Sequence, residues 1–334
     1  MNERHDPAQG SRADPGPHAT AHTEDMRSKS ELDAAIRRHR RAALVVNTRS
    51  RRGRRLYHSV RAQLSAAGFD LLGSFPVHRP RELGTSLAAA VELHPDLLIL
   101  GGGDGSISEA VRHLAYRDIA LGILPLGTTN NFARTLAIPL TVPGAITVLT
   151  DGKVADVDLG QVGDIPFANL VSVGVSAEVA GHVPALLKRL LGRVAYPLTA
   201  LTLLPRHQPF HAGITVGIQH YNVDTHQLNI ANGSFHAGQP ITGDASADDR
   251  LLLVYPLGGT HRYQLITAVF RHAITGRRRG LTEPAFLAVN DLWLHTDPPL
   301  PLDIDGEIRG HTPTRITLAS EALRVMVTPD FPDT

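Results

Sequence analysis

The hydrophobic positions of the chain fall into two parts with different periodicities. Between residues 42 and 124, short continuous apolar runs alternate with stretches in which apolar residues recur at helical spacing. Short apolar runs are typical of buried strands, and helical spacing is typical of amphipathic helices. This alternation predicts βαβ units around a parallel sheet. The expected strands are 42–46, 69–75, 96–100 and 119–124, and the expected helices are 56–67, 83–93 and 107–114.

The pattern changes after about Asp151. Helical spacing recurs only near residues 183–204, and short alternating runs appear instead. These runs are Ile214-Val216-Ile218, Leu228-Ile230, Leu251-Leu253 and Ile316-Leu318. Alternation of this kind indicates half-buried antiparallel strands. The fold class is therefore α/β, with an N-terminal α/β domain followed by a mostly β domain.

Composition and charge narrow the class of protein. The 334 residues suggest about two domains, and 42% hydrophobic against 19% charged residues excludes wholesale disorder. A net charge of +1 argues against a nucleic-acid partner. With no cysteine, the chain has no disulfide and no thiolate zinc ligand. The polar segment before the first strand, residues 1–35, is expected to be a disordered tail, and it has no signal-peptide pattern, so we expect a cytoplasmic protein.

A glycine-rich loop follows the third expected strand. Residues 101–106 read GGGDGS and open an expected helix. Glycines let the backbone approach an anion, and the first amides of a helix then face a phosphate. The loop lacks the GxxxxGK[ST] pattern, and Asp104 within it suits a magnesium ion or its waters. The alternative is a glycine-rich turn that only ends a strand, but the strand–loop–helix context favours a phosphate site.

A second loop, residues 124–134, also follows a strand. Its sequence LPLGTTNNFAR supplies small hydroxyls, amides and one arginine, which suit the phosphate tail of a nucleotide. Taken alone, it is equally compatible with an ordinary helix N-cap.

Together these segments resemble the diacylglycerol kinase catalytic-domain family, which includes bacterial lipid kinases and the sphingosine and ceramide kinases. The resemblance rests on GGGDGSISEAVRHL and LGILPLGTTNNFARTLAIP, and it extends over roughly residues 40–330. It continues through Phe167-Ala168-Asn169 with Ser172 and Gly174, Asn232-Gly233, Asp244-Ala245 with Asp248-Asp249, and Asp305-Gly306-Glu307. It implies an α/β nucleotide-binding domain at 36–150, completed by 320–330, and a β-sandwich lipid-kinase domain at 151–319, with the site between them.

The resemblance also implies an ATP-dependent lipid kinase that acts on a hydroxyl of a lipid such as diacylglycerol. Its ATP site would be formed by Asn47, Gly102, Gly103, Asp104, Gly105, Ser106, Thr128 and Asn130. Glu307 would be the general base that takes the proton of the lipid hydroxyl. A structural Mg²⁺ would be bound by Asp249 and by the backbone carbonyls of Ser246 and Leu251.

Several positions depart from the family pattern. Asn131 replaces an aspartate near the expected metal, and Arg112-His113 replace Asn-Gly. Ser106 replaces a threonine but keeps the hydroxyl, Pro76 replaces a threonine near the nucleotide, and Arg250 replaces a glycine between the expected metal ligands. Two alternatives to a lipid kinase therefore stay open. One is an NAD kinase, which shares the GGDG loop, and the other is a lipid- or nucleotide-binding relative with weak turnover.

A lipid acceptor would place the protein at the inner face of the membrane as a peripheral partner. Val183, Leu186, Leu187, Leu190, Leu191 and Val194 keep helical spacing, with Lys188, Arg189 and Arg193 off that stripe. The segment suits an anionic bilayer surface or, equally well, packing against the β domain. Neither the acceptor lipid nor the oligomeric state is indicated by the sequence.

Overall fold

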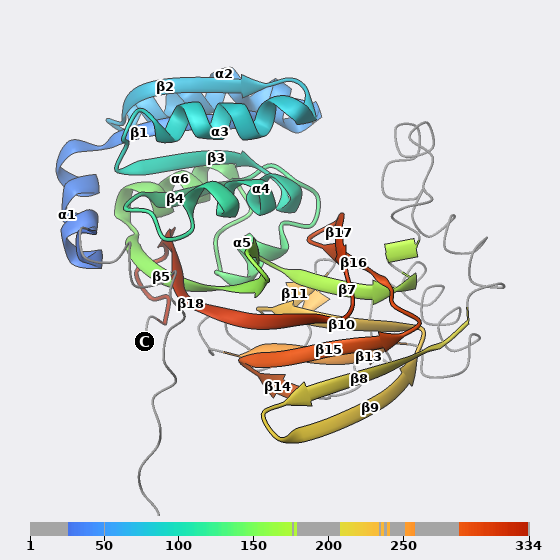
Figure 1. The fold of residues 1–334 in the computed structure, drawn as a ribbon. Coiled ribbons are helices and arrows are strands. Elements are labelled where there is room, and N and C mark those ends of the chain that lie inside the picture. Colours follow the sequence, from blue (N-terminus) through green and yellow to red (C-terminus); the bar gives the residue numbers. More distant parts are fainter. Residues whose placement is uncertain are drawn as a thin grey trace, which may run out of the picture.

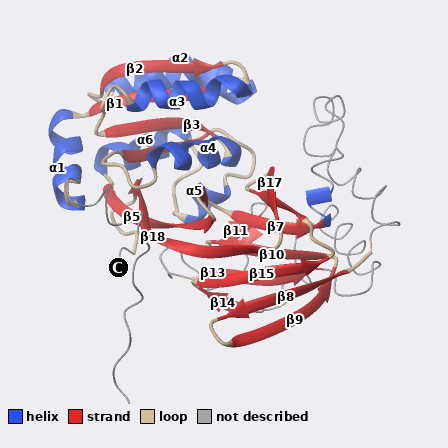
Figure 2. Cartoon of the chain, in the orientation of Figure 1, coloured by secondary structure: helices blue, strands red, loops and turns tan. Residues whose placement is uncertain are grey.

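The computed structural model describes residues 26–49, 51–175, 177–178, 208–233, 235–236, 239–240, 251–257 and 287–332. These residues form an α/β part and a β-sandwich part joined by continuous strands (Figure 1). Figure 2 shows the helices gathered around the first part, whereas strands dominate the second. This arrangement confirms the fold class expected from the two periodicities. Among the described helices, none has both the length and the apolar character needed to span a membrane.

Helices and parallel strands build the first part. Its elements are α1 (Lys29–His39), β1 (Arg41–Asn47), α2 (Arg51–Ala66), β2 (Asp70–Val77), the short helix η1 (Pro80–Glu82), α3 (Leu83–Val91), β3 (Leu97–Gly102), α4 (Asp104–Leu114), β4 (Ala120–Pro125), α5 (Asn131–Thr135) and α6 (Val142–Asp151). The strands lie in the order β2-β1-β3-β4, and each neighbouring pair is parallel. In Figure 1, α3 and α4 lie together on one face of these strands.

Burial on both faces explains why these strands read as continuous apolar runs. Every residue of β3 and β4 is buried, and so are the five central residues of β1. Helices cover both sides of a parallel sheet, so no face of the strand is left for polar residues. The carboxyl ends of β1, β3 and β4 consequently meet at one edge, where ligands bind in open α/β sheets.

Antiparallel strands build the second part. They are β6 (Ile165–Phe167), β7 (Leu170–Gly174), β8 (Phe210–Val216), β9 (Gln219–Thr225), β10 (Gln227–Asn232), β11 (Phe235–His236), β12 (Gln239–Pro240), β13 (Leu252–Leu257), β14 (Leu287–Val289), β15 (Asp291–Asp297), β16 (Pro301–Ile304) and β17 (Glu307–His311). A 6-stranded sheet, β14-β13-β10-β7-β16-β17, faces the strands β15-β8-β9. Their inward side chains share one core, and β15 alternates between buried and accessible positions as a sandwich strand should.

Two long strands join the parts. β18 (Thr314–Val327) pairs in parallel with β4 near its end and antiparallel with β15 near its start. β5 (Lys153–Val162) follows β18 along most of its length. The first core includes β5 up to Leu159, and the second core begins at Val162. The chain therefore changes cores along β5 rather than at residue 151.

The expected tail over residues 1–35 is wrong for its last part, because α1 begins at Lys29. Ser28 and Glu31 form a capping box that satisfies the first amides of the helix. Leu32 and Ile36 then lie one turn apart on the buried face, against the first core. A single apolar pair does not reveal a helix in sequence, which is why the polar composition around it favoured a tail.

Two further expectations concern the β part, the alternating run 214–218 and the helical stretch 183–204. The alternating run 214–218 ends early, because Gly217 has a φ of +58° and turns the chain, leaving Ile218 94% exposed. The helical stretch 183–204, including the apolar stripe, lies outside the described residues.

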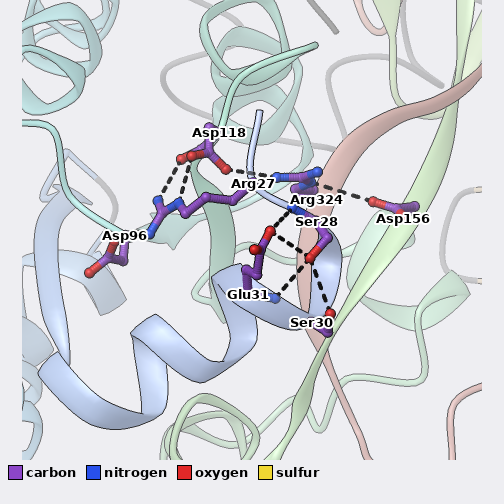
Figure 3. A network of polar contacts seen from close by, with 8 residues as sticks. All are labelled: Arg27, Ser28, Ser30, Glu31, Asp96, Asp118, Asp156 and Arg324. Atoms are coloured by element: carbon purple, nitrogen blue, oxygen red, sulfur yellow. Dashed lines mark hydrogen bonds and ion pairs between the residues drawn. The ribbon is translucent and has the colours of Figure 1, made fainter. Parts of the chain in front are cut away.

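A polar network joins the start of α1 to the edge of the sheet that lies opposite the carboxyl ends of the parallel strands (Figure 3). Arg27 donates from Nη1 to Asp96 at 2.7 Å and from Nε to Asp118 at 2.6 Å. Asp118 also accepts from Arg324 of β18 at 2.8 Å. The Asp96 side chain is only 7% exposed, so the guanidinium of Arg27 compensates a carboxylate that has lost most of its water.

Replacing Arg27 is therefore expected to destabilise the fold. In Arg27→Ala the buried carboxylate of Asp96 loses its positive partner, and we expect the free energy of unfolding to fall by about 1–3 kcal/mol. Urea denaturation measures this change. The matched control is Arg315→Ala, because Arg315 and Asp291 pair at 2.6 Å with 64% and 46% of their side chains exposed. Such a surface pair contributes less than about 1 kcal/mol. Equal losses in the two variants would contradict this role of Arg27.

Candidate active site

A cleft of about 800 Å³ lies where the carboxyl ends of the parallel strands face the turn between β16 and β17. Asn47 at the end of β1, the loop 102–106 after β3, and Leu126 with Gly127 after β4 form one side. Asp305, Gly306 and Glu307 form the opposite side. The α/β part and the sandwich part thus each supply one wall.

Two glycine loops form the floor of the cleft in direct backbone contact. A Cβ on Gly103 would lie 2.8 Å from Cα of Gly127, and a Cβ on Gly127 would lie 2.4 Å from Cα of Gly103. The amides of Leu126 and Gly127 both donate to the carbonyl of Gly102, at 2.8 and 3.0 Å. Close approach of the two backbones, rather than an unusual φ, therefore requires glycine at both positions.

The floor presents the N-terminus of α4. Gly103 is the N-cap and has no side chain to occupy the first amides of the helix. A Cβ on Gly105 would meet no atom within 4 Å, so that position opens into the cleft. At the end of β1, Asn47 donates from Nδ2 to Oγ of Ser106 at 3.2 Å. An uncapped helix start in an open cleft is a favourable place for an anion.

Asp104 ties the glycine loop to the second loop. Its Oδ2 accepts from the hydroxyl of Thr129 at 2.8 Å, and its Oδ1 accepts from the amide of Phe132 at 3.2 Å. Both donors are neutral, and among the described residues Asp104 has no ion pair. No positively charged side chain of that part of the chain therefore neutralises its carboxylate.

The structure places most of the expected nucleotide residues together, but not all of them. Asn47 and residues 102–106 line the cleft. Thr128 is exposed and lies outside the lining. Asn130 is buried in a left-handed conformation and donates from Nδ2 to the carbonyl of Gly127 at 3.2 Å. Asn130 thus holds the second loop in shape and is not among the residues that line the cleft.

Asp305 connects the turn that carries Glu307 to the rest of the sandwich part. Its carboxylate accepts from three consecutive amides, those of Ala168, Asn169 and Leu170, at 2.8, 2.9 and 2.9 Å. Burial raises the pKa of Asp305, the three donors lower it, and the nearby charge of Asp104 raises it, with a raised pKa as the result. A charge on one wall of the cleft therefore affects the ionisation of a carboxyl group on the other wall.

Asn232 closes the same cluster from β10. Its Nδ2 donates to the carbonyls of Asp158 and Ala168, at 2.9 and 3.3 Å, and its amide donates to the carbonyl of Asn169 at 2.8 Å. Segments from residues 168, 232 and 305, far apart in the sequence, therefore form one hydrogen-bonded unit. This unit anchors the turn that precedes Glu307.

Glu307 opens β17 and lies among arginines. Its Oε2 accepts from Arg309 at 2.6 and 2.9 Å and from Arg112 of α4 at 3.3 Å. Partial burial raises the pKa of Glu307, but the hydrogen bonds and charges of Arg309 and Arg112 outweigh it and hold the pKa below its ordinary value. The side chain is 53% exposed, so solvent screens part of this effect.

Two arginines of the cleft were missed by sequence reasoning. Arg49 follows β1, and Arg81 lies in η1, and both line the cleft. Arg49 belongs to an arginine-rich run that is visible in the sequence, but Arg81 reaches the cleft only because β2 ends beside β1. Of the expected metal ligands, Ser246 and Asp249 lie outside the described residues, and Leu251 is exposed just before β13.

Comparisons with known proteins divide the chain in the same two parts. Residues 41–162 match the family model for the diacylglycerol kinase catalytic domain, and residues 169–327 match the model for the YegS C-terminal NAD kinase beta sandwich-like domain. A protein of Enterobacter sp. (strain 638) named "probable lipid kinase YegS-like" is 32% identical over 253 residues, covering 73% of this chain and 82% of its own. A diacylglycerol kinase of Staphylococcus saprophyticus is 24% identical over 302 residues, covering 87% and 97%. The crystal structure of a diacylglycerol kinase from Bacillus anthracis str. Sterne superimposes with a TM-score of 0.68 at 22% identity, over 87% of this chain and 98% of that one.

The two glycines of the loop should respond differently to alanine. In Gly103→Ala the methyl group meets the backbone of Gly127, so we expect a loss of about 1–3 kcal/mol in the free energy of unfolding. In Gly105→Ala the methyl group enters the open cleft, so the stability should change by less than about 0.5 kcal/mol while binding of ATP weakens. Thermal denaturation and calorimetric titration with ATP measure the two effects. Unchanged ATP affinity in a folded Gly105→Ala protein would exclude the loop as the phosphate site.

The three backbone hydrogen bonds of Asp305 predict a structural role for its side chain. In Asp305→Asn one carboxylate oxygen becomes an amide group that faces a backbone N–H, and we expect a loss of about 1–3 kcal/mol in the free energy of unfolding. Asp303→Asn in the same turn is the control, because its Oδ1 accepts from the exposed amide of Gly306 at 2.7 Å and asparagine keeps that acceptor. If both variants melt like the unmodified protein, the cluster does not hold the turn.

Proposed function

Because the chain belongs to the diacylglycerol kinase catalytic-domain family, we propose that it is an ATP-dependent lipid kinase. The enzyme transfers the γ-phosphate of ATP to a hydroxyl of a lipid such as diacylglycerol. One observation supports this proposal above all others: the uncapped N-terminus of α4 and the carboxylate of Glu307 line the same cleft from opposite walls. A phosphate site and a base must share one cleft if a phosphoryl group is to pass between them.

In the proposed complex, the phosphates of ATP rest on the floor formed by the two glycine loops. The amides at the start of α4 and its dipole favour the negative charge, and Gly105 leaves room for close approach. Arg49 and Arg81, both exposed in the cleft wall, add positive charge from the other side of the loop. Asn47 borders the nucleotide at the end of β1.

The cleft also fits the Mg²⁺ that accompanies ATP. Asp104 keeps a charged carboxylate with only neutral donors, and carboxylate oxygens are the ligands that Mg²⁺ prefers. Asp104 would hold the ion or one of its waters, and the bound ion would neutralise the phosphate charges that develop in transfer. Asn131 is the first residue of α5, so the family aspartate that it replaces would have stood next to the Phe132 amide that binds Asp104.

Glu307 is the proposed general base. As the lipid oxygen forms its bond to the γ-phosphorus, the bond from that phosphorus to the bridging oxygen of ADP breaks, and the hydroxyl proton passes to the Glu307 carboxylate. The base works only in its ionised form. Since the pKa of Glu307 is lowered, the acid limb of the activity profile should lie below the range of an ordinary glutamate. Activity is then lost only as the pH falls through that lowered pKa.

The lipid acceptor places the proposed reaction at a membrane surface. The stripe 183–194, with its flanking basic residues, is the segment that would contact an anionic bilayer. Such contact is peripheral and falls with rising salt, because exposed charges are screened beyond about 10 Å at 0.1 M.

The proposed base is tested by Glu307→Gln. The amide keeps the shape of the side chain but removes its basicity, so kcat should fall by about 10²–10⁴-fold while ATP affinity stays unchanged. Glu92→Gln is the matched control, because Glu92 is exposed at the end of α3, away from the cleft. Near-normal turnover in Glu307→Gln would remove Glu307 from the mechanism.

The activity itself is tested with labelled ATP, Mg²⁺ and three acceptors: 1,2-dioctanoylglycerol, a bacterial lipid extract and NAD. We expect label in a lipid product and none in NADP. Label in NADP alone would favour an NAD kinase, and ATP binding without any transfer would favour a binding protein. Either result would overturn the proposed function.

A further inference from the structure

We propose that Arg112 is the positioning residue for Glu307, because it ties that carboxylate to α4, the helix whose N-terminus forms the phosphate site. This inference rests on the proposed function.

A chain of alternating charges links the two walls of the cleft. Arg112 donates from Nη1 to Glu109 at 3.0 Å, three residues earlier on α4, and from Nη2 to Glu307 at 3.3 Å. Glu307 is also bound by Arg309, two residues along β17. Of these contacts, only the one from Arg112 to Glu307 crosses from the α/β part to the sandwich part.

Burial makes Arg112 the fixed member of this chain. Its side chain is 15% exposed, against 53% for Glu307 and 41% for Arg309. Its Nε is buried and has no hydrogen-bond partner among the described residues. The orientation of the guanidinium therefore depends on its two carboxylate contacts, and Glu109 holds it from the side of α4.

Because Arg112 and the phosphate site both belong to α4, the distance between them is fixed by the helix. Arg112 lies eight residues after Asp104, which is about 12 Å along the axis of an α-helix. The phosphate site and the anchor of the base therefore belong to one rigid element. Arg309 lacks this property, because it shares a strand with Glu307 and moves with it.

The charged groups around Glu307 come from three elements. Arg309 of β17 and Arg112 of α4 contact it directly, and Glu109 and His113 of α4 and Asp305 of the preceding turn line the same cleft. Glu109 balances part of the charge of Arg112. Removal of Arg112 therefore has two consequences for Glu307: it loses a positive neighbour, and it loses its link to α4.

Replacement of the two arginines separates these consequences. We measure kcat against pH with 1,2-dioctanoylglycerol for Arg112→Gln, Arg112→Lys and Arg309→Gln. Both glutamine variants should move the acid limb upward by roughly 0.2–0.7 pH unit, the range that one partly exposed ion pair supplies. On the plateau, where Glu307 is ionised in every variant, Arg112→Gln should lose about 10- to 100-fold more kcat than Arg309→Gln, since only it releases the base from α4.

Arg112→Lys keeps the charge but not the fork that reaches two carboxylates. It should leave the acid limb near that of the unmodified protein while the plateau falls to an intermediate level. The lysine variant also keeps the proposal testable if Arg112→Gln does not fold. Equal plateaus for Arg112→Gln and Arg309→Gln, or full activity in either Arg112 variant, would overturn the proposal.

A measurement without substrate separates this proposal from the proposed function. The Glu307 carboxyl carbon is followed by NMR in protein labelled with [δ-¹³C]glutamate and assigned with Glu307→Gln. An upward shift of its titration in Arg112→Gln supports the contact even if no lipid is phosphorylated, and an unshifted titration refutes it. Absence of lipid phosphorylation in the unmodified protein refutes only the proposed function.

Discussion

The hydrogen-bonded carboxylate of Asp305 is the interaction on which the site depends. A carboxylate that has lost part of its water is stable only when hydrogen bonds replace that water. Here three consecutive amides from residues 168–170 supply those bonds, and Asn232 fastens the same segment to β10. Since Glu307 follows two residues later, this cluster fixes where the only carboxylate proposed as a base enters the cleft.

The floor of the cleft, on the side of the α/β part, is shaped by steric contact rather than by charge. Gly103 and Gly127 bring two backbones into contact, and any side chain at either position would push the loops apart. Charges of the two walls also act on each other across the cleft: the negative charge of Asp104 raises the pKa of Asp305, and Arg112 donates to Glu307. Steric contact makes the floor, the proposed phosphate site, rigid, whereas the ionic contact across the cleft exposes the proposed base to pH and to nearby charge.

The continuous strands explain how walls from two cores keep one geometry. β18 pairs with β4 at Leu121, near the start of β4, and with β15 in the sandwich, and β5 runs along it. A ladder of backbone hydrogen bonds therefore spans the junction, which a flexible linker between two separate domains would not provide. Membership of the lipid-kinase family agrees with this architecture, because the matched family models cover both parts.

By itself, the sequence determined the features that are local. Buried runs such as 96–100 and 119–124 identified the parallel strands, and GGGDGS after a strand identified the loop that lines the cleft, because burial and turn chemistry act on neighbouring residues. The resemblance to a family identified Glu307 as the candidate general base. Tertiary structure decided what depends on distant residues: that Asn130 binds the carbonyl of Gly127 within its loop, that Arg81 lines the cleft, that α1 packs on the first core, and that Arg112 contacts Glu307. Arg112 and Glu307 are 195 positions apart in the chain, and only the tertiary fold brings their opposite charges within hydrogen-bond distance.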